Sequence, residues 1–132
     1  MARPLIAILD DDLAHLQLLA EILASEGYVV ATEADLRAGY VFVKDHQPAL
    51  VILDLLQDRQ PVGLEVIRAL RADPATRAVA ILVLSADTRT LAAHAARFRA
   101  DGIGVLEKPY DLDDLLGMVR HRLPTSAVVT EL

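Results

Sequence analysis

The sequence predicts an α/β fold in which a doubly wound, five-stranded parallel sheet carries helices on both faces. The first observation behind this prediction is that the short apolar runs are continuous rather than alternating, a pattern typical of strands buried on both sides. The second is that stretches with apolar residues three and four positions apart separate these runs, as expected for helices that pack on a sheet. Such alternation favours parallel strands joined by right-handed crossovers.

Strands are expected at five places in the chain. The three strongest apolar runs are 5–9, 50–53 and 79–84, and the two weaker ones are 28–31 and 103–106. Runs of this length, bounded by polar residues, suit buried strands better than helices.

A helical pattern follows each of the five runs. The apolar positions that mark the helices are Leu16, Leu19 and Leu23; Leu36, Tyr40 and Val43; Leu64, Ile67 and Leu70; Leu91, Ala95 and Phe98; and Leu112, Leu115, Leu116 and Val119. Asp12 suits the N-cap of the first helix and Gly27 its C-cap, and Pro124 is expected to end the last helix.

Length and composition predict one folded domain. The chain has 132 residues, of which 54% are hydrophobic, which suits a single core rather than a disordered segment. We expect the domain to span 1–124 and a short tail or linker stump to span 125–132. Because the chain contains no cysteine, disulfides and thiolate metal sites are excluded.

Charge and hydropathy argue against nucleic-acid and membrane partners. The net charge is −6 and the arginines form no basic block with interleaved aromatic residues, whereas binding to phosphate backbones needs clustered positive charge. No apolar run approaches the ~20 residues that cross a bilayer, and the N-terminus lacks the build of a signal peptide. We therefore expect a cytoplasmic protein without direct nucleic-acid or membrane binding.

Chemically active residues follow four of the predicted strands. An acidic triplet occupies 10–12 after the first strand, Asp54 follows the third, Ser85 follows the fourth, and Lys108 comes shortly after the fifth. Because ligands of open α/β sheets bind beyond the carboxyl ends of the strands, we expect these side chains to meet at one edge.

This pattern resembles the response-regulator receiver family of two-component signalling, the superfamily of the chemotaxis receivers. The resemblance covers roughly residues 4–123 and implies a flavodoxin-like strand order of 2-1-3-4-5. The segments that carry it are Leu9-Asp10-Asp11-Asp12, Val51-Ile52-Leu53-Asp54-Leu55, Val83-Leu84-Ser85-Ala86 and Leu106-Glu107-Lys108-Pro109.

The resemblance implies a phosphoryl acceptor at Asp54 and a Mg²⁺ ion beside it. Asp11 and Asp54 would ligate the ion directly, Asp10 directly or through water, and the backbone carbonyl of Leu56 would be a further ligand. Hard oxygen donors suit Mg²⁺, and a divalent ion offsets the charge that gathers when a carboxylate attacks a phosphoryl group.

By the same resemblance, Lys108 pairs with the phosphoryl oxygens and Ser85 donates a hydrogen bond to the attached group. The segment after Ser85 would then move and change the surface formed by the last two strand–helix units. The domain would catalyse only its own phosphorylation and dephosphorylation, and would not otherwise be an enzyme.

The implied partners are proteins. A sensor histidine kinase or a histidine phosphotransfer protein would supply the phosphoryl group, and a downstream protein or a fused output domain would receive the signal. The chain is expected to be either a stand-alone receiver or the N-terminal piece of a longer regulator, and a homodimer through the signalling surface is left open.

Two departures from the family pattern stand out. Position 105, three before Lys108, often carries an aromatic residue and here is Val105, from which we expect a smaller activation response. The loop 55–62 contains one extra residue, with Pro61 displaced and Gly63 nine positions after Asp54. The loop charges at positions 58 and 59 are within reach of the site, although solvated charges are the commoner outcome.

Simpler interpretations and two other functions also fit parts of this pattern. An acidic triplet before a helix often serves only as a cap, and Tyr110 has no assigned chemistry. The four histidines are expected to be solvated residues on helix faces: His15, His46, His94 and His121. The alternatives are a receiver-fold interaction module that is not phosphorylated, and a phosphatase of the haloacid-dehalogenase type.

Overall fold

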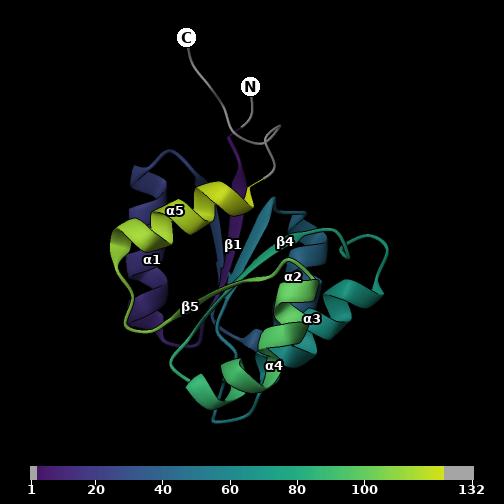
Figure 1. Cartoon of the computed structure of the whole chain (residues 1–132). Helices are drawn as coiled ribbons and strands as arrows, with labels where there is room; N and C mark the ends of the chain where they lie inside the picture. The colour runs from purple at the N-terminus through teal and green to yellow at the C-terminus, as the bar shows by residue number, and fades with distance from the viewer. Residues whose placement is uncertain (1–2, 124–132) are drawn as a thin grey trace.

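The computed structural model describes residues 3–123 and shows five strands alternating with helices (Figure 1). The elements in chain order are β1 Leu5–Leu9, α1 Leu13–Ser25, β2 Val29–Glu33, the 3₁₀ helix η1 Leu36–Ala38, α2 Gly39–His46, β3 Leu50–Leu53, α3 Val62–Ala72, β4 Ala80–Ser85, α4 Thr88–Ala100, β5 Gly104–Glu107 and α5 Leu112–Arg122. The expected α/β fold is confirmed. None of the helices within these residues is long and apolar enough to cross a membrane.

All five strands are parallel and follow the order β2-β1-β3-β4-β5, as the family resemblance implied. The chain leaves β1 for the edge strand β2 and returns to the other side of β1 with β3. Leu9 pairs with Leu53 at the last residues of these two neighbouring strands. The strand order therefore reverses between β1 and β3, where α/β sheets open a crevice at their carboxyl edge.

Each face of the sheet is covered by its own set of helices. Helices α1 and α5 lie on one face, and α2, α3 and α4 lie on the other (Figure 1). Within β1, Ile6 and Ile8 pack toward the first set, whereas Ala7 and Leu9 pack toward the second. All four side chains are fully buried, and this two-sided burial explains why the strands are apolar at every position.

The helix boundaries follow local signals with a few exceptions. The Asp12 carboxylate accepts the N–H of His15 and caps α1, as predicted. The C-cap of α1 is Glu26, so that Gly27 is the residue after it, and its φ of 94° suits glycine. Helix α5 ends at Arg122. Pro124, expected to end this helix, and the expected tail 125–132 lie outside the described residues.

Some predicted helical positions were wrong in detail. The pattern from Leu36 to Val43 is divided, because Leu36 belongs to η1 and α2 begins only at Gly39. Ala95 and Leu112 are exposed rather than part of a buried stripe. The helices α4 and α5 thus bury fewer of the predicted residues than α1, whose three predicted leucines are all buried.

The extra residue after Asp54 is absorbed by a tight hairpin. Gln57 and Gln60 exchange two backbone hydrogen bonds of 3.0 and 2.9 Å, and the residues between them, Asp58 and Arg59, have φ values of 52° and 62°. Two consecutive positive φ values are typical of type I′ turns, which favour Asn and Gly. The loop therefore holds two non-glycine residues in a strained conformation.

Replacing Asp58 by Asn and Arg59 by Gly is expected to raise the free energy of unfolding by about 1 kcal/mol, because Asn-Gly is the preferred pair for such a turn. Urea unfolding followed by circular dichroism measures the change. As a control, Ala96→Gly on the exposed side of α4 should lower the same quantity by about 1 kcal/mol. A double variant no more stable than wild type would contradict the assigned strain.

Candidate functional site

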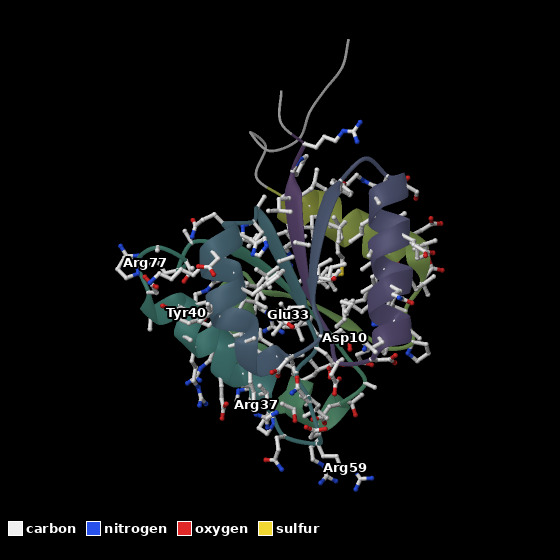
Figure 2. The ribbon with its side chains drawn as sticks, turned by 180° about the vertical axis from the view of Figure 1, so that it is seen from behind. Asp10, Glu33, Arg37, Tyr40, Arg59 and Arg77 are labelled. Atoms are coloured by element: carbon white, nitrogen blue, oxygen red, sulfur yellow. The ribbon has the colours of Figure 1, made fainter. Side chains whose placement is uncertain are left out.

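Backbone hydrogen bonds carry the sheet pattern one residue past the strands and fix the start of the site. The N–H of Asp54 donates to the Leu9 carbonyl at 3.2 Å, and the N–H of Lys108 donates to the Ser85 carbonyl at 2.9 Å. Asp54 and Lys108 therefore continue the hydrogen-bond pattern of the sheet by one residue each. Asp10 follows β1 directly and lies at the same edge (Figure 2).

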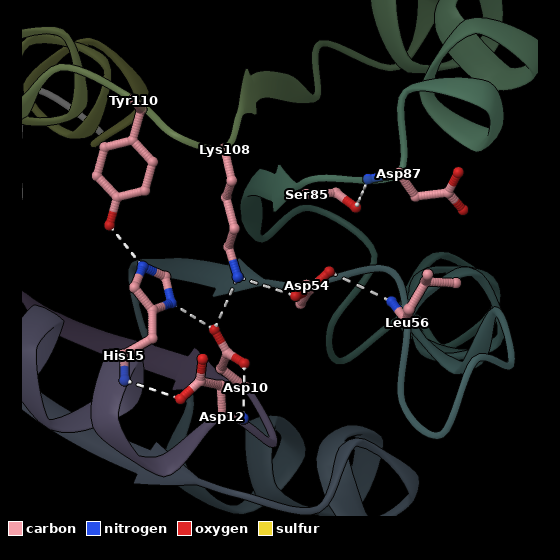
Figure 3. A network of polar contacts seen from close by, with 9 residues as sticks. All are labelled: Asp10, Asp12, His15, Asp54, Leu56, Ser85, Asp87, Lys108 and Tyr110. Atoms are coloured by element: carbon pink, nitrogen blue, oxygen red, sulfur yellow. Dashed lines mark hydrogen bonds and ion pairs between the residues drawn. The ribbon is translucent and has the colours of Figure 1, made fainter.

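The amine of Lys108 lies between two carboxylates (Figure 3). Its Nζ is 2.9 Å from Oδ2 of Asp54 and 3.3 Å from Oδ2 of Asp10. The Asp10 side chain is only 4% exposed and that of Asp54 16% exposed. The structure thus brings together three of the predicted site residues, and one of the two acids remains reachable from solvent.

The carboxylates change the proton affinity of the amine. Burial alone would lower the pKa of Lys108, but the hydrogen bond and charge of Asp54, followed by those of Asp10, outweigh this and raise its pKa above the ordinary 10.5. The amine is therefore firmly cationic at neutral pH, as a partner for anionic oxygens must be.

Asp11 adds further negative charge at the same edge. Its side chain is exposed, yet partial desolvation and the charge of Asp10 raise the pKa of the Asp11 carboxyl above the ordinary 3.8. The charges of Asp54 and Asp58 act in the same direction. An acid whose pKa is raised by other acids marks a place with an excess of negative charge.

Ser85 and Leu56, two further residues of the predicted site, also have defined hydrogen-bond partners. Ser85 is 1% exposed, and its Oγ accepts the N–H of Asp87, the N-cap of α4, at 3.1 Å. The N–H of Leu56 donates to Oδ1 of Asp54 at 3.3 Å. The hydroxyl of Ser85 is thus tied to the β4–α4 loop, while the Asp54 carboxylate is held on both of its oxygens.

His15 is part of this site, and the prediction that it is a solvated residue was wrong. Its Nδ1 lies 2.6 Å from Oδ2 of Asp10, and its Nε2 lies 2.6 Å from the hydroxyl of Tyr110. The histidine side chain is only 15% exposed. A usable signal existed, because His15 lies in the first turn after the acidic triplet and Tyr110 is two residues after Lys108. His46 and His121 are exposed, as predicted.

The charged residues of the hairpin, Asp58 and Arg59, are exposed. Asp58 is 77% exposed and lies 3.8 Å from the guanidinium of Arg37. Arg37 and Arg59 extend from the same end of the molecule as Asp10 (Figure 2). Asp58 therefore acts on the site through its charge on Asp11 rather than through contact. Gly63 lies close behind the site, since a Cβ there would be 2.3 Å from the carbonyl oxygen of Asp54.

The donor set fits a hard divalent cation chemically. Asp10 and Asp54 share the amine of Lys108, and Asp11 lies next to Asp10 in the sequence, so the acids at this edge outnumber the cation. Oxygen-only ligands with excess negative charge are what Mg²⁺ takes in proteins. Within residues 3–123, however, no three side chains of His, Asp or Glu are already arranged to hold an ion. The chain thus supplies the right ligand chemistry, with Lys108 placed among the acids.

Comparison with known proteins agrees with this geometry. A family model described as the response regulator receiver domain matches residues 6–120. The chain belongs to the response-regulator receiver family. It is therefore a receiver domain of two-component signalling.

The receiver is similar to part of longer regulators. The DNA-binding response regulator MtrA of Mycolicibacterium paratuberculosis is 31% identical over 121 residues, which are 92% of this chain and 52% of MtrA. The DNA-binding dual master transcriptional regulator RpaA of Synechocystis is 30% identical over 135 residues, covering 98% of this chain and 55% of RpaA. The chain spans about half the length of these curated relatives.

Solved structures show the same fold over about nine-tenths of this chain. The chemotaxis protein CheY4 of Vibrio cholerae superposes with a TM-score of 0.80 at 25% identity, over 92% of this chain and 100% of CheY4. A response regulator receiver protein from Pseudomonas putida gives a TM-score of 0.77 at 30% identity, over 92% and 98% of the two chains.

Two of the hollows in the described part of the chain lie near the last two helices and beside the site. One of about 570 Å³ lies between α4 and α5 and is lined by Leu91, Phe98, Val105 and Met118 among others. The short Val105 side chain is half-buried at its wall. The other, of about 580 Å³, is a mainly apolar groove beside the site, between α1 and the β5–α5 loop, where Lys108 belongs to its lining.

Asp54→Asn is expected to lower the pKa of Lys108, because burial then acts on the amine with less charge to oppose it. In wild type, the pair contributes to the free energy of unfolding. This contribution is fully present below pH 10.5 and is lost as the pH rises through the raised pKa of Lys108. The variant should lose less stability over that alkaline range. Titration of the lysine Cε and Hε signals by NMR measures the pKa, with Asp113→Asn on the exposed side of α5 as control. An unchanged Lys108 pKa in Asp54→Asn would contradict the pairing.

Proposed function

We propose that this receiver accepts a phosphoryl group on Asp54, from a sensor histidine kinase or a histidine phosphotransfer protein, in a Mg²⁺-dependent reaction. The observation that carries the proposal is the Lys108 amine held between Asp54 and Asp10. This arrangement places a fixed positive charge beside a carboxylate that solvent can still reach.

The chemistry is a transfer from nitrogen to oxygen. A carboxylate oxygen of Asp54 bonds to phosphorus, the phosphorus–nitrogen bond of the donor breaks, and its electron pair returns to the donor imidazole, which takes up a proton. Lys108 and the N–H of Leu56 hold the carboxylate in one orientation, so the chain contributes mainly positioning and charge. A bound Mg²⁺ would offset the charge of the transferred group, with Asp10, Asp11, Asp54 and the Leu56 carbonyl as its ligands.

The attached group would act on the β4–α4–β5–α5 face. It brings about −1.5 to −2 charge and strong acceptor oxygens, with which Lys108 would pair. The Ser85 hydroxyl would donate to the same oxygens. The Ser85 hydroxyl accepts the N–H of Asp87, the N-cap of α4. Movement of Ser85 toward the phosphoryl group would therefore alter the β4–α4 loop.

The wider role rests on the relatives. MtrA and RpaA are named as DNA-binding proteins, and this chain matches about half of each. We therefore propose a downstream protein or a fused output domain as the receiver's target, with the receiver spanning 1–124, acting in the cytoplasm and catalysing only its own modification. The proposal includes a homodimer formed through the β4–α4–β5–α5 face.

Incubation with acetyl phosphate and Mg²⁺ should add the mass of one phosphoryl group to wild type, read by intact mass spectrometry. Asp54→Asn should gain nothing, because its amide is not a nucleophile. Asp45→Asn, on an exposed position of α2, should gain the group as wild type does. No gain in wild type, together with no binding of beryllofluoride and Mg²⁺, would favour an interaction module that is not phosphorylated.

Beryllofluoride with Mg²⁺ is expected to shift the backbone NMR signals of α4, β5 and α5 less in wild type than in Val105→Tyr. The physical reason is that the hollow between α4 and α5 can receive an aromatic ring, whereas valine is too short to follow the movement of Ser85. Leu13→Tyr, an exposed position on α1, serves as the matched control. Large changes across the face of wild type, equal to those in Val105→Tyr, would contradict this expectation.

A further inference from the structure

His15 joins two loops that lie far apart in the sequence. Its Nδ1 contacts Asp10 in the β1–α1 loop and its Nε2 contacts Tyr110 in the β5–α5 loop, both at 2.6 Å (Figure 3). The histidine and tyrosine rings meet edge to face, with centroids 5.8 Å apart and planes at 61°. Both ring nitrogens are thus used, which fixes the ring orientation.

The direction of one hydrogen bond follows from the partners. An ionised carboxylate only accepts hydrogen bonds, so Nδ1 of His15 must carry a proton and donate it to Asp10. Burial raises the pKa of the Tyr110 hydroxyl, so the hydroxyl keeps its proton and can donate to Nε2. The result is a chain that runs from the Tyr110 hydroxyl through His15 to the Asp10 carboxylate.

The Asp10 carboxylate accepts hydrogen bonds from three donors. Its Oδ1 accepts the N–H of Asp12 at 3.0 Å, and its Oδ2 accepts from Lys108 at 3.3 Å and from His15 at 2.6 Å. The carboxylate is almost completely buried, so each donor counts toward offsetting its charge. The shortest of the three bonds comes from His15.

Two residues of the β5–α5 loop are connected to the same carboxylate. Lys108 reaches Asp10 directly, and Tyr110, two residues further on, reaches the same oxygen of Asp10 through His15. The β5–α5 loop is therefore connected to the Asp10 carboxylate twice, directly by Lys108 and through His15 by Tyr110. A change in the position of Tyr110 therefore acts on Asp10 through His15, which contacts both residues.

We propose that His15 is a positioning residue that fixes the Asp10 carboxylate beside Lys108 and Asp54 and links it to Tyr110. The inference rests on the proposed function in one respect, namely that Asp10 serves a Mg²⁺ ion. The partners that orient a metal-ligating carboxylate typically contribute 10–100-fold to metal affinity. His15 would have this effect on Asp10 without touching the phosphoryl group.

The test measures the Mg²⁺ dissociation constant without any phosphoryl transfer, from the amide NMR signals of the β1–α1 loop. His15→Leu should weaken Mg²⁺ binding roughly tenfold or more. His15→Asn, whose amide nitrogen can replace Nδ1, should recover most of this loss. Gln17→Leu, an exposed change on the same helix, should bind as wild type does, and urea unfolding of each variant separates binding from stability.

Tyr110→Phe tests the hydrogen-bond chain itself, because the Tyr110 hydroxyl bonds to His15 rather than to Asp10. It should weaken Mg²⁺ binding by itself but add little in the His15→Leu background, since the chain is already broken there. Additive effects, or an affinity of His15→Leu equal to that of wild type, would overturn the inference.

A second readout keeps this inference separate from the proposed function. ¹⁵N NMR of the histidine side chains in the absence of metal should show a proton on Nδ1 of His15 and a shifted Nε2 signal in Tyr110→Phe. If wild type binds no Mg²⁺ but shows these signals, the proposed function fails, whereas the hydrogen-bond chain from Tyr110 through His15 to Asp10 is supported. If Nδ1 of His15 carries no proton, the proposed hydrogen-bond chain is refuted whether or not Mg²⁺ binds.

Discussion

The architecture of this receiver's site depends on one amine held between two carboxylates. Asp10 and Asp54 follow the neighbouring strands β1 and β3, whereas Lys108 follows β5, and β4 lies between. Lysine meets this requirement because its flexible four-carbon stem ends in a compact charge that can reach across an intervening strand. Two like charges 4 Å apart repel by roughly 4 kcal/mol at an effective dielectric constant of 20. The amine offsets a repulsion of this kind, so the sheet edge and its charges hold one another in place.

Much of the sheet could be predicted because burial leaves its mark in a single sequence. The run at 5–9 is apolar throughout, since consecutive residues such as Ile6 and Ala7 face different helix layers and both need apolar partners. The meeting of Asp54 and Lys108 followed from one rule, that parallel strands end at a common edge. The strand order, in contrast, came only from the family resemblance, because no local pattern states which strands are neighbours.

The contact between His15 and Tyr110 was not predicted, although each residue lies close in sequence to a predicted site residue. His15 and Tyr110 are separated by 95 positions, and only the packing of α1 beside the β5–α5 loop brings them together. The hairpin at Asp58 and Arg59 was hidden for another reason, since neither residue carries the glycine or asparagine signal of its turn. Ala95 shows a third limit: helical spacing identifies a candidate stripe, but what packs against the helix in the fold decides which of its members are buried.

The hairpin has a practical consequence for studying the molecule. Its ends are closed by the bonds between Gln57 and Gln60, and the Gln57 side chain is anchored by the N–H of Leu36 at 2.6 Å and by Asp35 at 2.9 Å. Its tip, in contrast, points into solvent. Exposed tips with anchored ends are the places where chains accept additional residues. A fluorescent reporter or a short tag inserted between Asp58 and Arg59 would therefore sit a few residues from Asp54 while leaving the sheet edge undisturbed.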